Sequence, residues 1–208
     1  MSTRHLFHDP QRVLHQSIHS CTLLNPSLGY DEYSKSIYRR PTANRTSSKG
    51  DNRKVTLIAG GGAGHEPAHG GYVGTGMLDG AVSGHIFASP SARQIEECAR
   101  LALGADSDPG RVSSQDLELL VIINNYTGDI LNFGLAIERI KNWPNSSPPL
   151  GSKVKVESVV VDDDVSVGRS QGGKVGRRGL AGNILVCKVL GAVSYTRIRS
   201  AKLRVQNI

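Results

Sequence analysis

Hydrophobic residues form two kinds of pattern along the chain, which predict helices and buried strands. Leu14, Ile18 and Cys21 recur at spacings of four and three, so residues 10–22 are expected to form a first helix. Other hydrophobic residues form short, continuous runs, as is typical of strands that are buried on both faces. These strands are expected at 55–59, 117–123 and 154–161, with a weaker candidate at 81–87.

Further helices are expected between and after these runs. Ser89 and Pro90 predict the start of one helix, with serine at the N-cap and proline at the first helical position. Two more helices are expected over Asp129–Lys141 and Gly179–Leu190. Because buried strands alternate with helices, we predict an α/β fold with a mostly parallel sheet and helices on both faces.

Three loops that follow predicted strands are rich in glycine and aspartate, at residues 60–76, 124–129 and 162–179. Ligands of parallel sheets bind just beyond the carboxyl ends of the strands. We therefore expect the functional site to lie where these three loops meet.

The segment from Gly60 to Gly71 reads GGGAGHEPAHGG. It lacks the Gly-Lys-Ser/Thr ending of a phosphate loop, and His65 stands where a dinucleotide fingerprint needs a small residue. The spacing of His65 and His69 matches that of zinc proteases, but the surrounding glycines and Pro67 disfavour the sustained helix that this chemistry needs. His65 is then either an exposed general base or hydrogen-bond donor, or a packed loop histidine. His69 and His85 are weaker candidates for the same roles.

Charged residues in the other two loops each allow two interpretations. Asp129 either caps the helix that follows or acts beside His65 by accepting a proton from a hydroxyl group. The acidic run 162–164 is either a Mg²⁺ site or an exposed turn. Arg177 and Arg178 either recognise a phosphate or are solvated loop residues.

Composition and charge narrow the range of functions. The chain has 208 residues, of which 38% are hydrophobic, so it can bury a core. The net charge is +7, but the basic residues concentrate in the polar stretch 35–54 and in 191–208, so no nucleic-acid partner is expected. No apolar run is long enough to span a membrane, and no secretory signal is present, so we expect a cytoplasmic protein. Three widely spaced cysteines exclude a disulfide framework.

Four segments, taken in order, resemble the substrate-binding domain of dihydroxyacetone kinases, also called glycerone kinases. They are Leu57–His69, Ile86–Ser91, Asn125–Phe133 and Val161–Gly182. The segment Asn25–Gly29 is similar to the eukaryotic, ATP-using, single-chain members. The resemblance covers residues 1–192 and leaves 193–208 as a basic tail outside the family domain.

The resemblance implies a substrate and roles for several residues. Dihydroxyacetone or glyceraldehyde would lie against the glycine turn, and the family's catalytic histidine and aspartate match His65 and Asp129. Asp129 would draw a proton from the attacking hydroxyl, while His65 would hydrogen-bond to the substrate. The family's other substrate contacts would fall on Gly61, Gly62 and Ser89.

The chain also departs from the family. Asn124, a further expected substrate contact, stands where the family usually has lysine. The later strand whose histidine holds the substrate carbonyl covalently is absent, and so is the helical domain that binds ATP and Mg²⁺. We therefore expect a fragment of an ATP-dependent kinase, homodimeric in its full-length form and without a metal site of its own. The alternative is a catalytically inactive triose-binding or regulatory protein.

Overall fold

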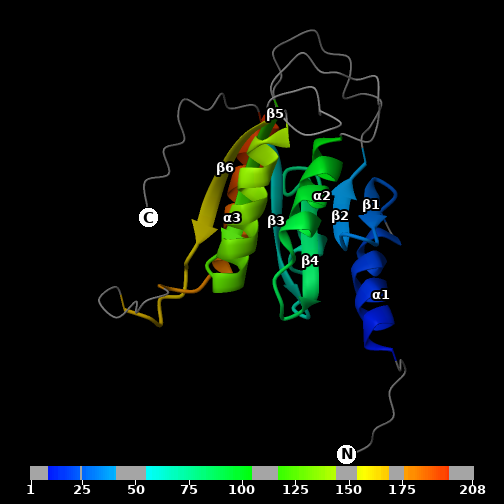
Figure 1. Ribbon diagram of the computed structural model, residues 1–208, viewed down its shortest axis with the longest axis horizontal. Helices are drawn as coiled ribbons and strands as arrows, with labels where there is room; N and C mark the ends of the chain where they lie inside the picture. Colours follow the sequence, from blue (N-terminus) through cyan, green and yellow to red (C-terminus); the bar gives the residue numbers. More distant parts are fainter. Residues whose placement is uncertain are drawn as a thin grey trace, which may run out of the picture.

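A six-stranded sheet runs through the middle of the molecule, in the order β1-β2-β4-β3-β5-β6 (Figure 1). The computed structural model describes residues 9–23, 25–40, 55–104, 117–143, 154–168 and 176–196. The basic residues at 41–54 and 197–208 therefore lie outside the described residues. The strands are β1 (Leu28–Asp31), β2 (Ser36–Arg39), β3 (Thr56–Ala63), β4 (Gly80–Ile86), β5 (Leu117–Asn124) and β6 (Val154–Val161).

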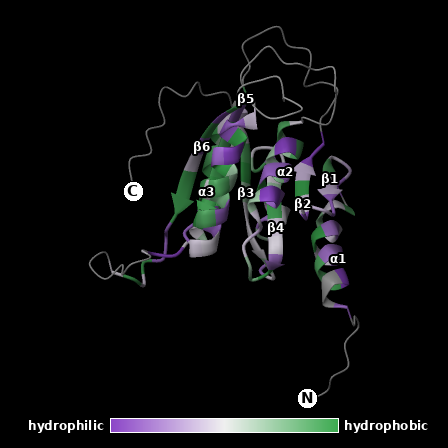
Figure 2. Cartoon of the chain, in the orientation of Figure 1, coloured by the Kyte–Doolittle hydropathy of each residue, from purple (hydrophilic) through white to green (hydrophobic). Residues whose placement is uncertain are grey.

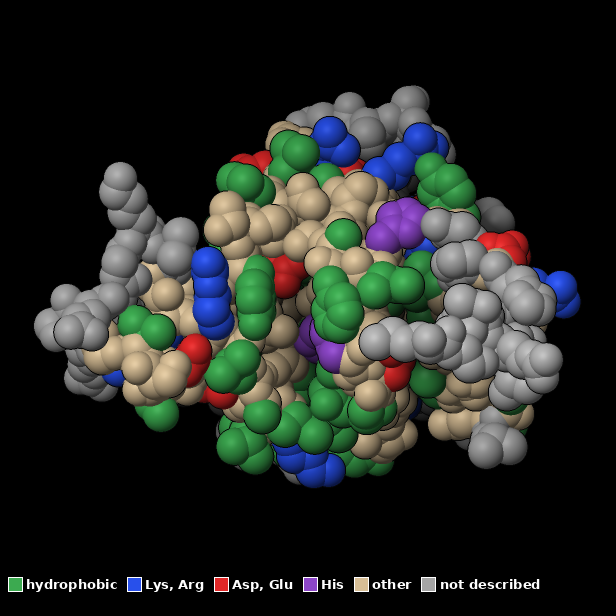
Figure 3. Space-filling model, turned by 90° about the horizontal axis from the view of Figure 1, so that it is seen from below, with side chains coloured by type: hydrophobic (Ala, Val, Ile, Leu, Met, Phe, Trp, Pro, Cys, Tyr) green, Lys and Arg blue, Asp and Glu red, His purple; other side chains and the backbone are tan. Residues whose placement is uncertain are grey.

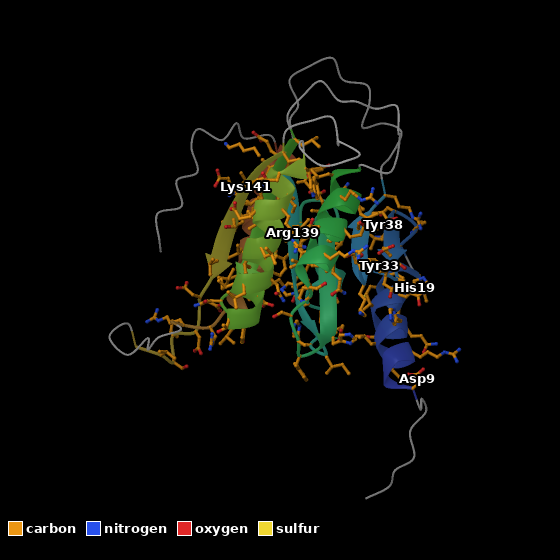
Figure 4. The ribbon with its side chains drawn as sticks, viewed as in Figure 1. Asp9, His19, Tyr33, Tyr38, Arg139 and Lys141 are labelled. Carbon is orange, nitrogen blue, oxygen red and sulfur yellow. The ribbon has the colours of Figure 1, made fainter. Side chains whose placement is uncertain are left out.

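Two helices cover each face of the sheet. One face packs against α2 (Ala92–Leu103) and α3 (Thr127–Lys141), and the other packs against α1 (Pro10–Leu23) and α4 (Gly182–Thr196). Arg139 of α3, which is labelled in Figure 4, pairs with Glu96 of α2 at 3.1 Å. None of the helices among the described residues is long and apolar enough to cross a membrane.

The sheet buries both of its faces, which explains the continuous apolar runs. Along β5, Val121 belongs to the core beneath α2 and α3, whereas Ile122 belongs to the core beneath α1 and α4. Successive side chains of a strand point to opposite faces, so both sets of positions must be hydrophobic here. Figure 2 shows hydrophobic residues along the strands and hydrophilic residues on the outer sides of α1 and α2.

The predicted fold class is confirmed, but one pair of strands was not predicted. Strands β3, β4, β5 and β6 are parallel, whereas β2 is antiparallel to both β1 and β4. Strands β1 and β2 have four residues each, and only Leu28 and Ile37 among them enter the hydrophobic core. So short a pattern cannot be told from a loop by periodicity alone.

The predicted end of the first buried strand was wrong. Strand β3 continues through the three glycines to Ala63, because β5 pairs with it as far as Gly60 and β4 pairs with it as far as Ala63. A Cβ atom at Gly60 would lie 2.4 Å from the carbonyl oxygen of Val82, so only glycine allows this close approach. The turn begins instead at Gly64, whose φ of +107° favours glycine.

Three helix starts also differ from those predicted. The N-cap of α2 is Ser91, which forms a reciprocal capping box with Gln94, so Ser89 and Pro90 precede the helix. Asp129 is not an N-cap, because α3 begins two residues earlier at Thr127. Helix α4 begins at Gly182 rather than at 179 and extends to Thr196.

Candidate functional site

The carboxyl ends of the four parallel strands bring several loops to one edge of the sheet. Figure 3 views this edge and shows histidine side chains near its middle, with hydrophobic and acidic side chains around them. The loops that meet there follow β3, β4, β5 and β6, as the sequence predicted for three of them. The edge therefore gathers the candidate residues from four segments of the chain.

Gly61 lies next to two polar side chains from different elements. A Cβ atom at this position would lie 3.3 Å from Cε1 of His69 and 3.8 Å from Oδ2 of Asp129. The absent side chain therefore leaves the backbone of β3 open toward an imidazole and a carboxylate. We call Gly61, His65, His69 and Asp129 the Gly61 site.

Asp129 is a buried carboxylate in the first turn of α3. Its residue is 4% exposed, and its Oδ1 atom has no hydrogen-bond partner. Burial raises the pKa of Asp129, while a hydrogen bond from the Ser89 hydroxyl and the charge of His65 lower it. The structure therefore holds a carboxylate with raised proton affinity, whose Oδ2 atom lies near Gly61 and whose Oδ1 atom has no partner.

Ser89 and Gly62 connect the loop after β4 to this site. A Cβ atom at Gly128 would lie 2.6 Å from Oγ of Ser89, so the hydroxyl lies directly over the first turn of α3. A Cβ atom at Gly62 would lie 2.8 Å from the Ala88 nitrogen and 2.9 Å from Phe87 backbone atoms. Gly62 therefore allows the end of β3 to pack against the loop after β4, whose backbone fills the space that a side chain would take.

The two histidines of the turn differ in their surroundings. His65 is exposed, and its ring lies 5.8 Å from that of His69 at a nearly perpendicular angle. His69 is only 3% exposed, and burial, aided by the charge of His65, lowers the pKa of His69 to about 4. His69 is thus uncharged near neutral pH, whereas His65 faces solvent.

The central position of His69 was missed by the sequence analysis, which ranked it below His65. The spacing of four residues was visible, but residues 66–69 form a turn rather than a helix, so only the fold places His69 beside Gly61. His85 is exposed near the end of β4.

Asn124 is the last residue of β5, the strand that neighbours β3. Gly60 of β3 pairs with Ile123 of β5, so Gly61 and Asn124 follow at the next position of the two strands. The alternation along β5 directs Asn124 to the face of α4, where its Oδ1 accepts a hydrogen bond of 2.7 Å from Nδ2 of Asn183.

The acidic run after β6 forms hydrogen bonds with its own surroundings. Asp163 accepts bonds from the backbone nitrogens of Leu180 and Gly182, at 2.6 and 2.7 Å, and so caps the start of α4. Hydrogen bonds from Ser166 lower the pKa of Asp164. Among the described residues, no group of three or more histidines, cysteines and acidic residues is arranged to hold a metal ion.

Both arginines of the last loop hold that loop in place. Nε of Arg177 donates to the Val167 carbonyl at 2.8 Å. Arg178 donates to the Asn125 carbonyl at 3.2 Å, and its guanidinium lies 5.5 Å from the centre of the Tyr126 ring. These contacts fix the segment between β6 and α4 against the end of β5.

Comparisons with known proteins connect this chain to one family. The family model described as the Dak1 domain matches residues 20–203. Dihydroxyacetone kinase 1 of Saccharomyces cerevisiae is 43% identical over 179 residues, which are 86% of this chain and 26% of the yeast protein. The dihydroxyacetone-binding subunit of the Escherichia coli PEP-dependent kinase is 39% identical over 91% of this chain and 45% of that subunit. The chain thus spans less than half of the length of these relatives.

Solved structures of two kinds are similar to the fold. The dihydroxyacetone kinase from C. freundii, in complex with AMP-PNP and Mg²⁺, matches 94% of this chain and 31% of its own, with 32% identity and a TM-score of 0.65. The dihydroxyacetone kinase operon co-activator Dha-DhaQ matches 88% of this chain and 47% of its own, with 30% identity and a TM-score of 0.64.

The sequence motifs, the sheet and the comparisons agree. The family model covers most of the chain, and two relatives of known activity are about 40% identical to it. This chain belongs to the Dak1 domain family of dihydroxyacetone kinases.

Proposed function

We propose that this chain binds a triose, dihydroxyacetone or glyceraldehyde, at the Gly61 site, as the substrate-binding part of an ATP-dependent dihydroxyacetone kinase. The observation that carries the proposal is the Asp129 carboxylate, which is buried with Oδ1 unpaired and lies beside Gly61. A buried polar atom without a partner is costly, and a hydroxyl group of a bound ligand would supply the missing hydrogen bond.

The proposed chemistry uses the two ionisable groups in different ways. Asp129 accepts the proton of the attacking hydroxyl, and its raised pKa increases its affinity for that proton. His65 hydrogen-bonds to the substrate from the exposed turn. Phosphoryl transfer depends mainly on positioning and charge stabilisation, so these groups prepare the acceptor hydroxyl rather than the phosphate.

The remaining proposed contacts surround the same position. The backbone of Gly61 and Gly62 approaches the substrate closely, because no side chain intervenes at Gly61. Ser89 and Asn124 offer a hydroxyl and an amide from the ends of β4 and β5. Hydrogen-bonding groups of this kind suit a small, uncharged polyol.

In this proposal ATP supplies the phosphoryl group and Mg²⁺ would neutralise its phosphate charge, and both would bind outside the described residues. Asp163 and Asp164 already accept hydrogen bonds within their loop, and the described residues contain no cluster that fits a metal ion. The homodimer expected for the complete kinase rests on the family resemblance.

Binding of dihydroxyacetone to the 208-residue chain tests the proposal. Isothermal titration should detect binding of dihydroxyacetone or glyceraldehyde, and Asp129→Asn should weaken it at least tenfold, or about 1.4 kcal/mol. Asp164→Asn is the matched control, because the Asp164 carboxylate accepts its hydrogen bonds from the nearby Ser166. A folded chain that binds neither triose would overturn the proposal.

A catalytically inactive triose-binding or regulatory protein is the second candidate. The similarity to the operon co-activator favours it, because that structure shares the fold at 30% identity. The two candidates differ when ATP, Mg²⁺ and the ATP-binding domain of the yeast relative are added in trans. The kinase part should then yield phosphorylated triose, whereas the regulatory protein should bind the triose without product formation.

A further inference from the structure

A chain of three hydrogen-bonding side chains leads from α4 to Asn124. Sγ of Cys187 donates to Oδ1 of Asn183 at 3.1 Å, and Nδ2 of Asn183 donates to Oδ1 of Asn124 at 2.7 Å. Asn183 and Cys187 are four residues apart and therefore lie one above the other on the same face of the helix. The proposed chemistry uses neither of them.

Burial limits the ways in which these groups can turn. Asn183 is 3% exposed and Cys187 is fully buried. Burial raises the pKa of Cys187 to about 12, so its thiol keeps the hydrogen that it donates to Asn183. With its oxygen occupied by this thiol, Asn183 presents its NH2 group to Asn124.

The backbone closes over Asn124 from the same side. A Cβ atom at Gly179 would lie 2.9 Å from Oδ1 of Asn124 and 3.0 Å from its Cα. Any larger residue at this position would push the segment before α4 away from β5. The glycine therefore allows Asn183 to come within hydrogen-bond distance of Asn124.

The side-chain amide of Asn124 has its NH2 group available to a ligand. Its oxygen accepts from Asn183, and within the described residues its NH2 group makes no hydrogen bond. Asn124 follows the Ile123–Gly60 pair and thus lies level with Gly61. An uncharged donor at this place matches a hydroxyl or carbonyl oxygen.

We infer that Asn183, supported by Cys187, is a positioning residue that orients Asn124 so that its NH2 group donates a hydrogen bond to a neutral oxygen of the ligand at the Gly61 site. The inference rests on the proposed function and adds to it a residue of α4 that the site motifs do not contain. The chain should therefore prefer a ligand that presents an uncharged carbonyl or hydroxyl oxygen to Asn124.

Asn183→Asp tests this inference with almost no change of shape. Aspartate cannot donate, so Asn124 must turn its NH2 group toward residue 183 and its oxygen toward the ligand. The dissociation constant of dihydroxyacetone should rise about tenfold in Asn183→Asp. In an Asn124→Ala background, Asn183→Asp should change this dissociation constant less than about twofold, since the Asn124 side chain that Asn183 orients is absent. An equal loss in both backgrounds would contradict the inference.

Cys187 supplies the matched controls. Cys187→Ser keeps a donor for Asn183 and should bind dihydroxyacetone about as tightly as the unsubstituted chain, whereas Cys187→Ala should bind it several-fold more weakly. Thermal melts establish that each variant is folded. A Cys187→Ala chain with unchanged affinity would remove the thiol from the inference and leave Asn183 alone.

Nuclear magnetic resonance of the side-chain amides decides the orientation without any ligand. The NH2 protons of Asn183 should exchange with solvent more slowly than those of Asn124, and in Asn183→Asp the Asn124 protons should become the slow ones. Unchanged exchange at Asn124 would overturn the inference even if triose binding were lost. Absence of triose binding in the unsubstituted chain would overturn the proposed function instead, and the exchange rates would still decide the orientation.

Discussion

Two buried aspartates at opposite edges of the sheet have different surroundings. Asp79, at the start of β4, is 1% exposed, and its carboxylate accepts from Arg39 and from the Leu57 backbone nitrogen, each at 3.1 Å. Asp129, at the carboxyl edge, is buried to a similar degree, but its Oδ1 has no partner. Burial alone therefore does not distinguish a structural carboxylate from a functional one, whereas the presence or absence of partners does.

The largest expected effect is a loss of stability when Asp79, whose carboxylate has hydrogen-bond partners, is replaced. Asp79→Ala leaves the Leu57 backbone N–H buried without its acceptor and removes the partner of Arg39, so it should lower the free energy of unfolding by about 3 kcal/mol. Urea denaturation measures the loss. Glu138→Ala is the control, because the exposed pair between Glu138 and Lys141 should contribute less than about 1 kcal/mol. If both variants lost the same free energy of unfolding, the buried interactions of Asp79 would contribute no more to stability than the exposed ion pair of Glu138.

The next effect is the pH dependence of stability that arises from protonation of the buried His69 imidazole. The folded pKa of about 4 lies below the ordinary value of 6.5, so the unfolded chain binds the proton more readily. The stabilisation is complete above pH 6.5 and is lost as the pH falls toward 4, by about 3 kcal/mol. Denaturation curves between pH 7 and 4 should show this loss, and His69→Gln should reduce it. A slope that is unchanged in the variant would mean that other groups cause the acid dependence.

Replacing Asp129 should have the opposite effect on stability from replacing Asp79. Because burial raises its pKa, the charged form destabilises the fold once the pH rises above the range near 3.8 where the unfolded side chain titrates. Asp129→Asn should therefore match or exceed the stability of the unsubstituted chain by up to about 1 kcal/mol at pH 7, with a smaller difference at pH 4. A loss of several kcal/mol on the same substitution would place Asp129 with the structural carboxylates.

Gly61→Ala should have the smallest effect on stability. The added Cβ lies 3.3 Å from His69, a tight but adjustable contact, so the free energy of unfolding should change by less than about 1 kcal/mol. Triose affinity should nevertheless fall several-fold, because the methyl group occupies the side of β3 that faces Asp129. Gly60→Ala is the contrasting control, since its Cβ meets backbone at 2.4 Å and should destabilise the fold strongly. Full affinity in Gly61→Ala would exclude this face of β3 from the site.

Much of the fold follows from local sequence, but the candidate site follows only in part. The strand over 154–161 was predicted at its observed bounds from its valine-rich sequence, although only Val154, Val156 and Val161 of it are buried. Asp129 and His65 were identified from their motifs, and their roles remain proposals. His69 is only a weaker candidate in the sequence, since nothing in its local pattern places its ring beside Gly61 of β3.

The sequence by itself determined the α/β class, the gathering of glycine-rich and aspartate-rich loops at one edge, and membership of the family, because periodicity and contiguous motifs are local properties. The tertiary structure decided the rest. It turned the four-residue strands β1 and β2 into a hairpin at the edge of the sheet, and it left one oxygen of Asp129 without a partner. It also brought Asn183 to Asn124, 59 residues away, since strand register and helix packing fix such contacts and no local pattern encodes them.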